Sequence, residues 1–297
     1  MIRVLEFENE HLATVVRLLN DEYRDSHEFV PFDEERVLSQ IRRRGIGIFV
    51  AEENGSVLGL IGTHLEERQE EHISWLAVRK GSDRRTVEDT LVTAVERKAE
   101  GDTVITTVDE GSSRINDWIN RGYDLNPGWL RMSAKLDHSK PVPKTAEEFN
   151  LRSLTVGEEA KLVEAINTGF GWRRLELGAV ENWKSEDPPF SEDWVQVAET
   201  REKIASAVVA RPDTDYNKYL HLKQGYLGPA TTLPEFRNKH IASALTVQAM
   251  NLLLEKGMNS ARLGTSEQNI SSITLLRTLG FQVDNVRKIM RKKLKNG

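Results

Sequence analysis

Residues 232–245, which read TLPEFRNKHIASAL, decide the fold. A strand-like segment ends at Pro234, a short turn carries Arg237 and Lys239, and apolar residues recur at helical spacing from Ile241 onward. The first turn of a helix has unpaired backbone N–H groups and a partial positive charge. Together with the two basic side chains, these groups predict a site for a pyrophosphate. The alternative interpretation is an ordinary joint between a strand and a helix, with a solvated basic turn.

A second segment, residues 269–281, reads NISSITLLRTLGF and follows a short predicted strand at 261–265. Residues 237–242 resemble the R-x-x-G-x-A motif of GNAT-type N-acetyltransferases, whose backbone amides hold the pyrophosphate of coenzyme A. Residues 269–281 resemble the family's N-x-x-(A/S)-x-x-L-Y-x-x-L-G-F motif, in the expected order and at the expected separation. The resemblance implies an α/β (α+β) fold, with a mixed, mostly antiparallel sheet flanked by helices, and acetyl-CoA as co-substrate.

The resemblance also implies which residues hold the cofactor. The strand residues pair with the pantetheine arm, the loop holds the pyrophosphate, and the asparagine of the second motif contacts the cofactor arm. The expected cofactor-binding residues are Thr232, Leu233, Arg237, Asn238, Lys239, His240, Ile241, Ala242 and Asn269.

Two residues depart from the family motifs. His240 stands where the family has glycine, which lets a phosphate approach the backbone closely. Leu276 stands where the family often has the tyrosine that protonates the leaving thiolate. Protonation would then come from another group or from solvent, or the domain binds its ligand without catalysing a reaction.

The group that accepts the amine's proton during acetyl transfer is not indicated by a motif. The predicted strand at 226–233 carries no carboxylate, and the candidates are Glu199 and Tyr226, either of which is also a typical surface or packing residue. The segment at 169–174, GFGWRR, suits a mobile lid over the acceptor, or a loop that packs its aromatic rings on the core.

The same predicted order of strands and helices occurs twice along the chain, at an offset of 154 to 158 residues. A polar segment with two prolines, residues 137–144, favours an extended linker. We therefore expect a first GNAT-like domain at 1–137, a linker at 138–148 and a second domain at 149–297, each closed by its own last strand. The whole chain then resembles a tandem GNAT protein.

The first copy lacks the pyrophosphate motif. Asp83 replaces the arginine, Thr86 the glycine and Glu88 the small residue. Acidic groups beside a helix N-terminus repel a pyrophosphate, although they suit the helix dipole. We interpret this half as a degenerate copy that has lost the cofactor. Its formal net charge is -8 over 1–140, against +3 over 141–297, although scatter of surface charge explains that difference equally well.

The expected activity is direct transfer of an acetyl group from acetyl-CoA to an amine of a small molecule or a peptide. The chain has no cysteine, so disulfides are excluded and no thiol can carry the acetyl group. The competing hypothesis is a non-catalytic acyl-CoA-binding or partner-binding module, which Leu276 and the degenerate first copy support.

Composition excludes several other classes of function. Mean hydropathy is -0.49, and neither a membrane span nor a signal peptide is expected, so we predict a cytoplasmic protein. The densest basic run, at 287–295, has no interleaved aromatic residues and does not favour nucleic-acid binding. The 7 histidines show no H-E-x-x-H spacing, so no metal site is expected. An oligomer is compatible with the sequence.

Overall fold

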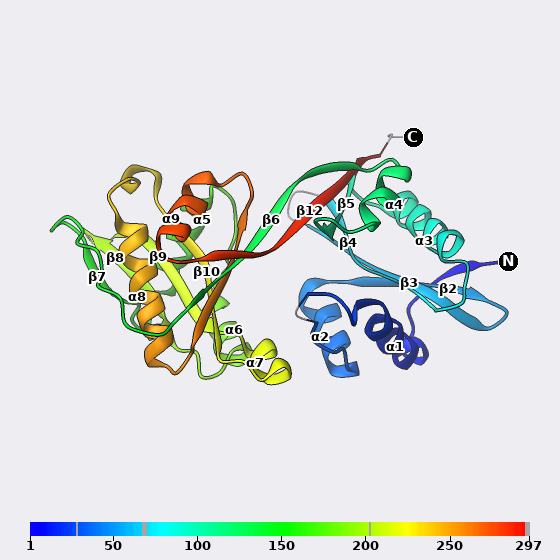
Figure 1. The fold of residues 1–297 in the computed structure, drawn as a ribbon, viewed down its shortest axis with the longest axis horizontal. Coiled ribbons are helices and arrows are strands. Elements are labelled where there is room, and N and C mark those ends of the chain that lie inside the picture. Colours follow the sequence, from blue (N-terminus) through cyan, green and yellow to red (C-terminus); the bar gives the residue numbers. More distant parts are fainter. Residues whose placement is uncertain (28, 67–69, 202, 295–297) are drawn as a thin grey trace. The chain divides into compact units, whose positions relative to one another are not determined.

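The chain folds into two compact units, described here from a computed structural model for residues 1–27, 29–66, 70–201 and 203–294 (Figure 1). The first unit comprises Met1–Trp129 with Asn285–Gly297, and the second comprises Leu130–Asp284. Each unit contains a mostly antiparallel sheet with packed helices, which confirms the predicted α/β (α+β) fold.

The first unit contains strands on both sides of a central parallel pair. Its elements are β1 (Arg3–Glu6), α1 (Leu12–Tyr23), α2 (Glu34–Arg44), β2 (Gly47–Glu53), β3 (Ser56–Leu65), β4 (Glu70–Val78), α3 (Arg84–Lys98), β5 (Thr103–Asp109), α4 (Arg114–Asn120) and most of β12 (Gln282–Lys293). The strand order is β1-β2-β3-β4-β5-β12, with β4 parallel to β5. Apolar residues of α1 and α2 form one core cluster, and those of α3 and α4 form another.

The second unit repeats this arrangement. Its elements are part of β6 (Asp124–Lys135), then β7 (Asn150–Ser153), α5 (Glu159–Phe170), α6 (Ala179–Glu186), β8 (Val195–Thr200), β9 (Lys203–Pro212), α7 (Thr214–Leu220), β10 (Gln224–Thr232), α8 (Ile241–Glu255), β11 (Ser260–Ser266) and α9 (Ile270–Thr278). The strand order is β7-β8-β9-β10-β11-β6, with β10 parallel to β11.

Helices α3 and α9 each begin at a residue whose side chain caps the helix. The Asp83 carboxylate accepts a hydrogen bond from the Thr86 N–H before α3, and the Asn269 side chain accepts one from the Ser272 N–H before α9, both at 3.2 Å. Among the described residues, no helix combines the length and the apolar character needed to cross a bilayer.

The last strand of each half belongs to the other unit, so the division differs from the expected boundaries of 1–137 and 149–297. β12 pairs antiparallel with β5 from Arg287↔Asp109 to Lys293↔Thr103, and Met290 is fully buried in the core of the first unit. In return, residues 130–135 of β6 lie next to β11 in the second unit. The alternating pattern of a strand predicts that it has one apolar face, but it does not determine which sheet supplies its partner.

Candidate functional site

Two parallel strands diverge at the centre of the second unit. The ladder between β10 and β11 runs from Gln224↔Ser260 to Tyr226↔Arg262, whereas the strands themselves extend to Thr232 and Ser266. On its other edge, β10 shifts register against β9 between Leu227 and Ala230. Such a bulge bends a strand away from its neighbour, so the bulge and the end of the ladder together open a wedge.

Backbone groups of β10 face this wedge. The Leu233 N–H donates to the Ala205 carbonyl oxygen of β9 at 2.9 Å. Since successive N–H groups of a strand point to opposite edges, those of Thr232 and Ala230 point toward β11, where the ladder has already ended. An extended ligand with amide groups, such as a pantetheine arm, can pair with this edge as an added strand would.

The predicted pyrophosphate loop has the backbone shape that its motif requires. Asn238 and His240 have φ angles of 64° and 60°, in the left-handed region that glycine adopts most readily. His240 is the N-cap of α8 and makes no capping hydrogen bond with its side chain. The N–H groups of the first turn, from Ile241 and Ala242 onward, are therefore left for a ligand.

The two basic side chains of the loop are exposed and held differently. The Arg237 guanidinium donates to the carbonyl oxygens of Gly169 at 3.2 Å and Thr232 at 3.3 Å, beside the wedge. Lys239 Nζ binds the Glu148 carboxylate at 2.8 Å. The structure thus brings Arg237 together with Thr232, while a ligand would have to draw Lys239 from its ion pair.

The second motif has a largely structural role in α9. The Asn269 side-chain oxygen caps the helix by accepting a hydrogen bond from the Ser272 N–H, and its contact with the cofactor arm stays a prediction. Leu276 is only 5% exposed and packs in the core. The position at which the family often has tyrosine therefore holds an apolar core residue here.

The two candidate proton acceptors have different surroundings. Glu199 binds the Arg152 guanidinium at 3.0 Å, and this contact lowers the pKa of Glu199. Arg152 also binds Glu158, at 2.7 Å. A general base works best with a pKa near neutrality, so this ion pair does not favour Glu199 in that role. Tyr226 is the last β10 residue in the ladder, with the Arg211 guanidinium 5.1 Å from the centre of its ring. Tyr226 thus lies at the apex of the wedge.

The segment after α5 forms an aromatic cluster. The rings of Phe170 and Trp172 meet edge to face at 5.8 Å, the Arg174 guanidinium lies within 6 Å of both ring centres, and each ring remains 37% exposed. Asn167 holds the segment by exchanging hydrogen bonds with the backbone N–H and carbonyl of Leu175. The rings are therefore only partly packed on the protein.

The first unit has the same wedge, filled by its own side chains. The ladder of β4 and β5 runs from Glu70↔Thr103 to Ile73↔Thr106, before both strands continue. The Leu76 N–H donates to the Tyr23 hydroxyl at 3.0 Å, and burial raises the pKa of this tyrosine. The Val78 N–H makes a longer contact with Glu22, at 3.5 Å. The last two residues of α1 thus occupy an edge that is open in the second unit.

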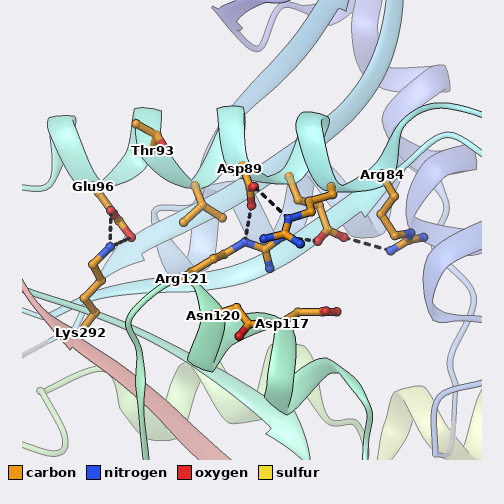
Figure 2. Close-up of a pocket in the computed structure, with 11 residues that line it drawn as sticks. Arg84, Asp89, Thr93, Glu96, Asp117, Asn120, Arg121 and Lys292 are labelled. Carbon is orange, nitrogen blue, oxygen red and sulfur yellow. Dashed lines mark hydrogen bonds and ion pairs between the residues drawn. The ribbon is translucent and has the colours of Figure 1, made fainter.

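An internal cluster of charges occupies the start of α3. Glu88 is buried and its carboxylate binds Arg84, Arg114 and Arg121 at 3.0, 2.7 and 2.9 Å. Glu22 forms two further bonds to Arg84, at 2.7 and 2.9 Å. A cavity of about 410 Å³ lies beside this cluster, and Figure 2 shows the charged side chains along α3 and α4 that line it. The guanidinium groups that could attract an anion are therefore already paired with carboxylates of the protein.

The residues that distinguish the two wedges are equivalent in position. α1 and α5 both have 12 residues, and Asn20 binds the backbone of Phe32 as Asn167 binds that of Leu175. Counting onward from these asparagines, Glu22 and Tyr23 correspond to Gly169 and Phe170. Our sequence analysis identified Glu88 but missed Glu22 and Tyr23, which a comparison of the two helix ends would have shown.

One protein family matches the chain in sequence. Residues 159–281 match the profile of the Acetyltransferase (GNAT) family. No curated protein gives a significant sequence match to the chain.

Solved structures with the same fold cover both units. A GCN5-related N-acetyltransferase from Sphaerobacter thermophilus has a TM-score of 0.73 at 16% identity, over 100% of this chain and 96% of that protein. A tandem GNAT protein from the clavulanic acid biosynthesis pathway has a TM-score of 0.71 at 14% identity, over 100% of both chains. The glucosamine N-acetyltransferase region of a fungal multi-domain β-N-acetylglucosaminidase has a TM-score of 0.76 at 13% identity, over 98% of this chain and 38% of that one. Of these structures, the one from the clavulanic acid pathway is described as a tandem GNAT protein.

Proposed function

We propose that this chain transfers an acetyl group from acetyl-CoA to an amine of a small molecule or a peptide, because residues 159–281 match the Acetyltransferase (GNAT) family. The observation that carries the proposal is the open wedge between β10 and β11, which ends at the exposed loop before α8. The pantetheine arm pairs with the β10 edge at Thr232. Leu233, which we expected to share this pairing, bonds to β9 through its N–H instead. Arg237 to Ala242 surround the pyrophosphate.

The reaction proceeds directly between the two substrates. The amine nitrogen attacks the thioester carbonyl carbon, so that a C–N bond forms and the C–S bond breaks. The amine loses a proton to a base or a water, and the CoA thiolate leaves and gains a proton. The chain has no cysteine that could hold the acetyl group in between.

Tyr226 is the candidate proton carrier that lies nearest the reacting groups. It is at the apex of the wedge, where the thioester end of an inserted pantetheine arm arrives. Its hydroxyl is 3.9 Å from the position that a side chain on Gly264 of β11 would take. The exposed rings of Phe170 and Trp172 form one wall for the acceptor.

The first unit binds no acetyl-CoA in this proposal. Glu22 and Tyr23 occupy its wedge, and Glu88 takes the arginine side chains at the start of α3. One cofactor site per chain follows.

The second candidate function is a non-catalytic acyl-CoA-binding or partner-binding module. It is favoured by one specific observation: Leu276 is a core residue, so no side chain at that position can protonate the thiolate. Binding of acetyl-CoA without turnover would distinguish this function from the transferase.

The test uses the full-length chain, since β12 completes the first unit and a cut between the halves would remove it. Calorimetric titration with acetyl-CoA should give one site per chain. A thiol reagent then measures CoA release in the presence of a pool of amines, with no background from the protein because it lacks cysteine. Release that depends on the amines, with an acetylated product found by mass spectrometry, supports the transferase. Binding without release supports the module, and no binding contradicts both.

A further inference from the structure

A compact cluster of two histidines and a glutamate lies at the hairpin between β3 and β4, in the first unit. His64 and His72 face each other directly across the ladder, with ring centres 5.1 Å apart. Glu66 follows the end of β3, and its Oε1 lies 3.1 Å from His64 Nε2 and 3.1 Å from His72 Nδ1. One carboxylate oxygen therefore lies against a nitrogen of each ring.

The three atoms have nearly the spacing of a coordination shell. Zinc binds histidine nitrogen at about 2.0–2.1 Å and carboxylate oxygen at about 2.0–2.2 Å, so neighbouring ligand atoms of a tetrahedral site are about 3.3 Å apart. Glu66 already meets this spacing with both rings, and the three atoms lie within 4.8 Å of one another. A bound ion would draw the two ring nitrogens toward that same spacing.

A neighbouring hydroxyl already orients one of the rings. Ser74 Oγ lies 3.0 Å from His64 Nδ1, on the side of the ring away from Glu66. When His64 Nε2 binds a metal, its neutral ring carries the proton on Nδ1, which then donates to Ser74. Such partners beyond the ligands fix the tautomer and the direction of a ligating histidine.

The cluster is incompletely satisfied as a purely hydrogen-bonded group. If both rings donate to Glu66, the other nitrogen of His72 has to find a separate partner. His72 Nε2 is buried and has no hydrogen-bond partner among the described residues. A buried polar atom without a partner is unfavourable, so the hydrogen bonds within the cluster do not fully satisfy His72.

We propose that His64, Glu66 and His72 form a binding site for one first-row divalent cation of the zinc type. Two imidazoles and one carboxylate are the ligands that such ions accept, and a water completes a tetrahedral set. The ion ties β3 to β4 at the turn end of their hairpin. No metal site was expected from the sequence, because the histidines show no H-E-x-x-H spacing. Glu66 lies 2 and 6 residues from the two histidines and comes between them only in the folded hairpin.

The first experiment titrates chelator-treated full-length protein with ZnCl2 in a calorimeter and repeats the titration with Co2+, whose visible absorption reports histidine coordination. We expect one ion per chain and a Co2+ spectrum typical of nitrogen and oxygen ligands. His64→Gln and His72→Gln should each weaken binding at least about 10-fold, and Ser74→Ala about 10-fold through loss of ring orientation.

His138→Gln is the matched control, because His138 also lies against a carboxylate, that of Asp137, but is exposed. Its affinity for Zn2+ should equal that of the unaltered protein. Circular dichroism and acetyl-CoA titration show that each variant is folded. Failure to bind Zn2+ at micromolar concentration, or binding that folded His72→Gln retains in full, overturns the proposal. Neither result bears on acetyl transfer, which is assigned to the second unit.

Discussion

The first turns of α3 and α8 occupy the same place in two copies of one fold, yet they are prepared for different partners. At α3, the carboxylates of Glu22 and Glu88 bind Arg84. In the second unit, the equivalent positions are Gly169 and Ala242, and the exposed Arg237 donates to backbone carbonyl oxygens. A fold can thus keep its wedge and its helix and still close the site to an anion, by supplying the negative charge from its own side chains.

The largest expected effect concerns the basic side chains of the open site. Arg237→Ala combined with Lys239→Ala should weaken acetyl-CoA binding about 100-fold, because each charged contact with a phosphate contributes about 1.5 kcal/mol or more. Arg85→Ala is the control at α3, since Arg85 is 78% exposed at the equivalent turn. Calorimetry on both proteins checks this. An equal loss of affinity in both would refute the assignment of the site to the second unit.

The second prediction concerns the Glu22 carboxylate, which binds Arg84 in the first unit. Glu22→Gln should lower the free energy of unfolding by about 1–2 kcal/mol. The amide has one acceptor oxygen where Glu22 has two, so one hydrogen bond from Arg84 is lost and the other no longer joins opposite charges. Glu181→Gln is the control, since this surface carboxylate pairs with Lys184 and is 73% exposed, so little change is expected. Denaturant unfolding measures both. If the two variants lose equal stability, Glu22 does not hold Arg84 in the way that the contact distances indicate.

The third prediction transfers the acidic residue to the open unit. Gly169→Glu should bind acetyl-CoA about 10-fold more weakly than Gly169→Gln, because the added charge repels the pyrophosphate. Both variants share a steric cost, since a Cβ at Gly169 would lie 2.0 Å from Thr231 Oγ1. The ratio of their dissociation constants therefore isolates the charge. A ratio near one would mean that the pyrophosphate lies away from the end of α5.

The smallest effect is expected at the N-cap of α8. His240 has a φ of 60°, and His240→Gly should raise the free energy of unfolding by less than about 1 kcal/mol, since glycine adopts this conformation without steric cost. The matched change in the first unit is Thr86→Gly, in the first turn of α3, and it should lower stability because Thr86 binds Asp83. Thermal unfolding of both variants shows whether each change raises or lowers stability. Destabilisation by His240→Gly would show that the imidazole makes stabilising contacts.

Much of the molecule follows from local pattern. The predicted strands at 226–233 and 261–265 correspond to β10 and β11, and the predicted order of elements occurs in both halves. Apolar periodicity is read from neighbouring positions alone, so the sequence is enough to predict it. The motif at 237–242 marks the exposed loop and the start of α8, and its histidine takes the conformation that the motif glycine would. The acidic substitutions at 83 and 88 indicated that the first copy differs.

Only the tertiary structure decided what depends on distant partners. β12 completes the first unit and residues 130–135 belong to the second, and no local pattern specifies such an exchange. The contacts of Tyr23 with Leu76 and of Glu22 with Arg84 join residues 53 and 62 positions apart. The pairing of His64 with His72 depends on the register of one hairpin. The sequence by itself determined the elements and their order, whereas packing determined which edges were filled and which stayed open, because a buried donor must find its partner wherever the folded chain brings one.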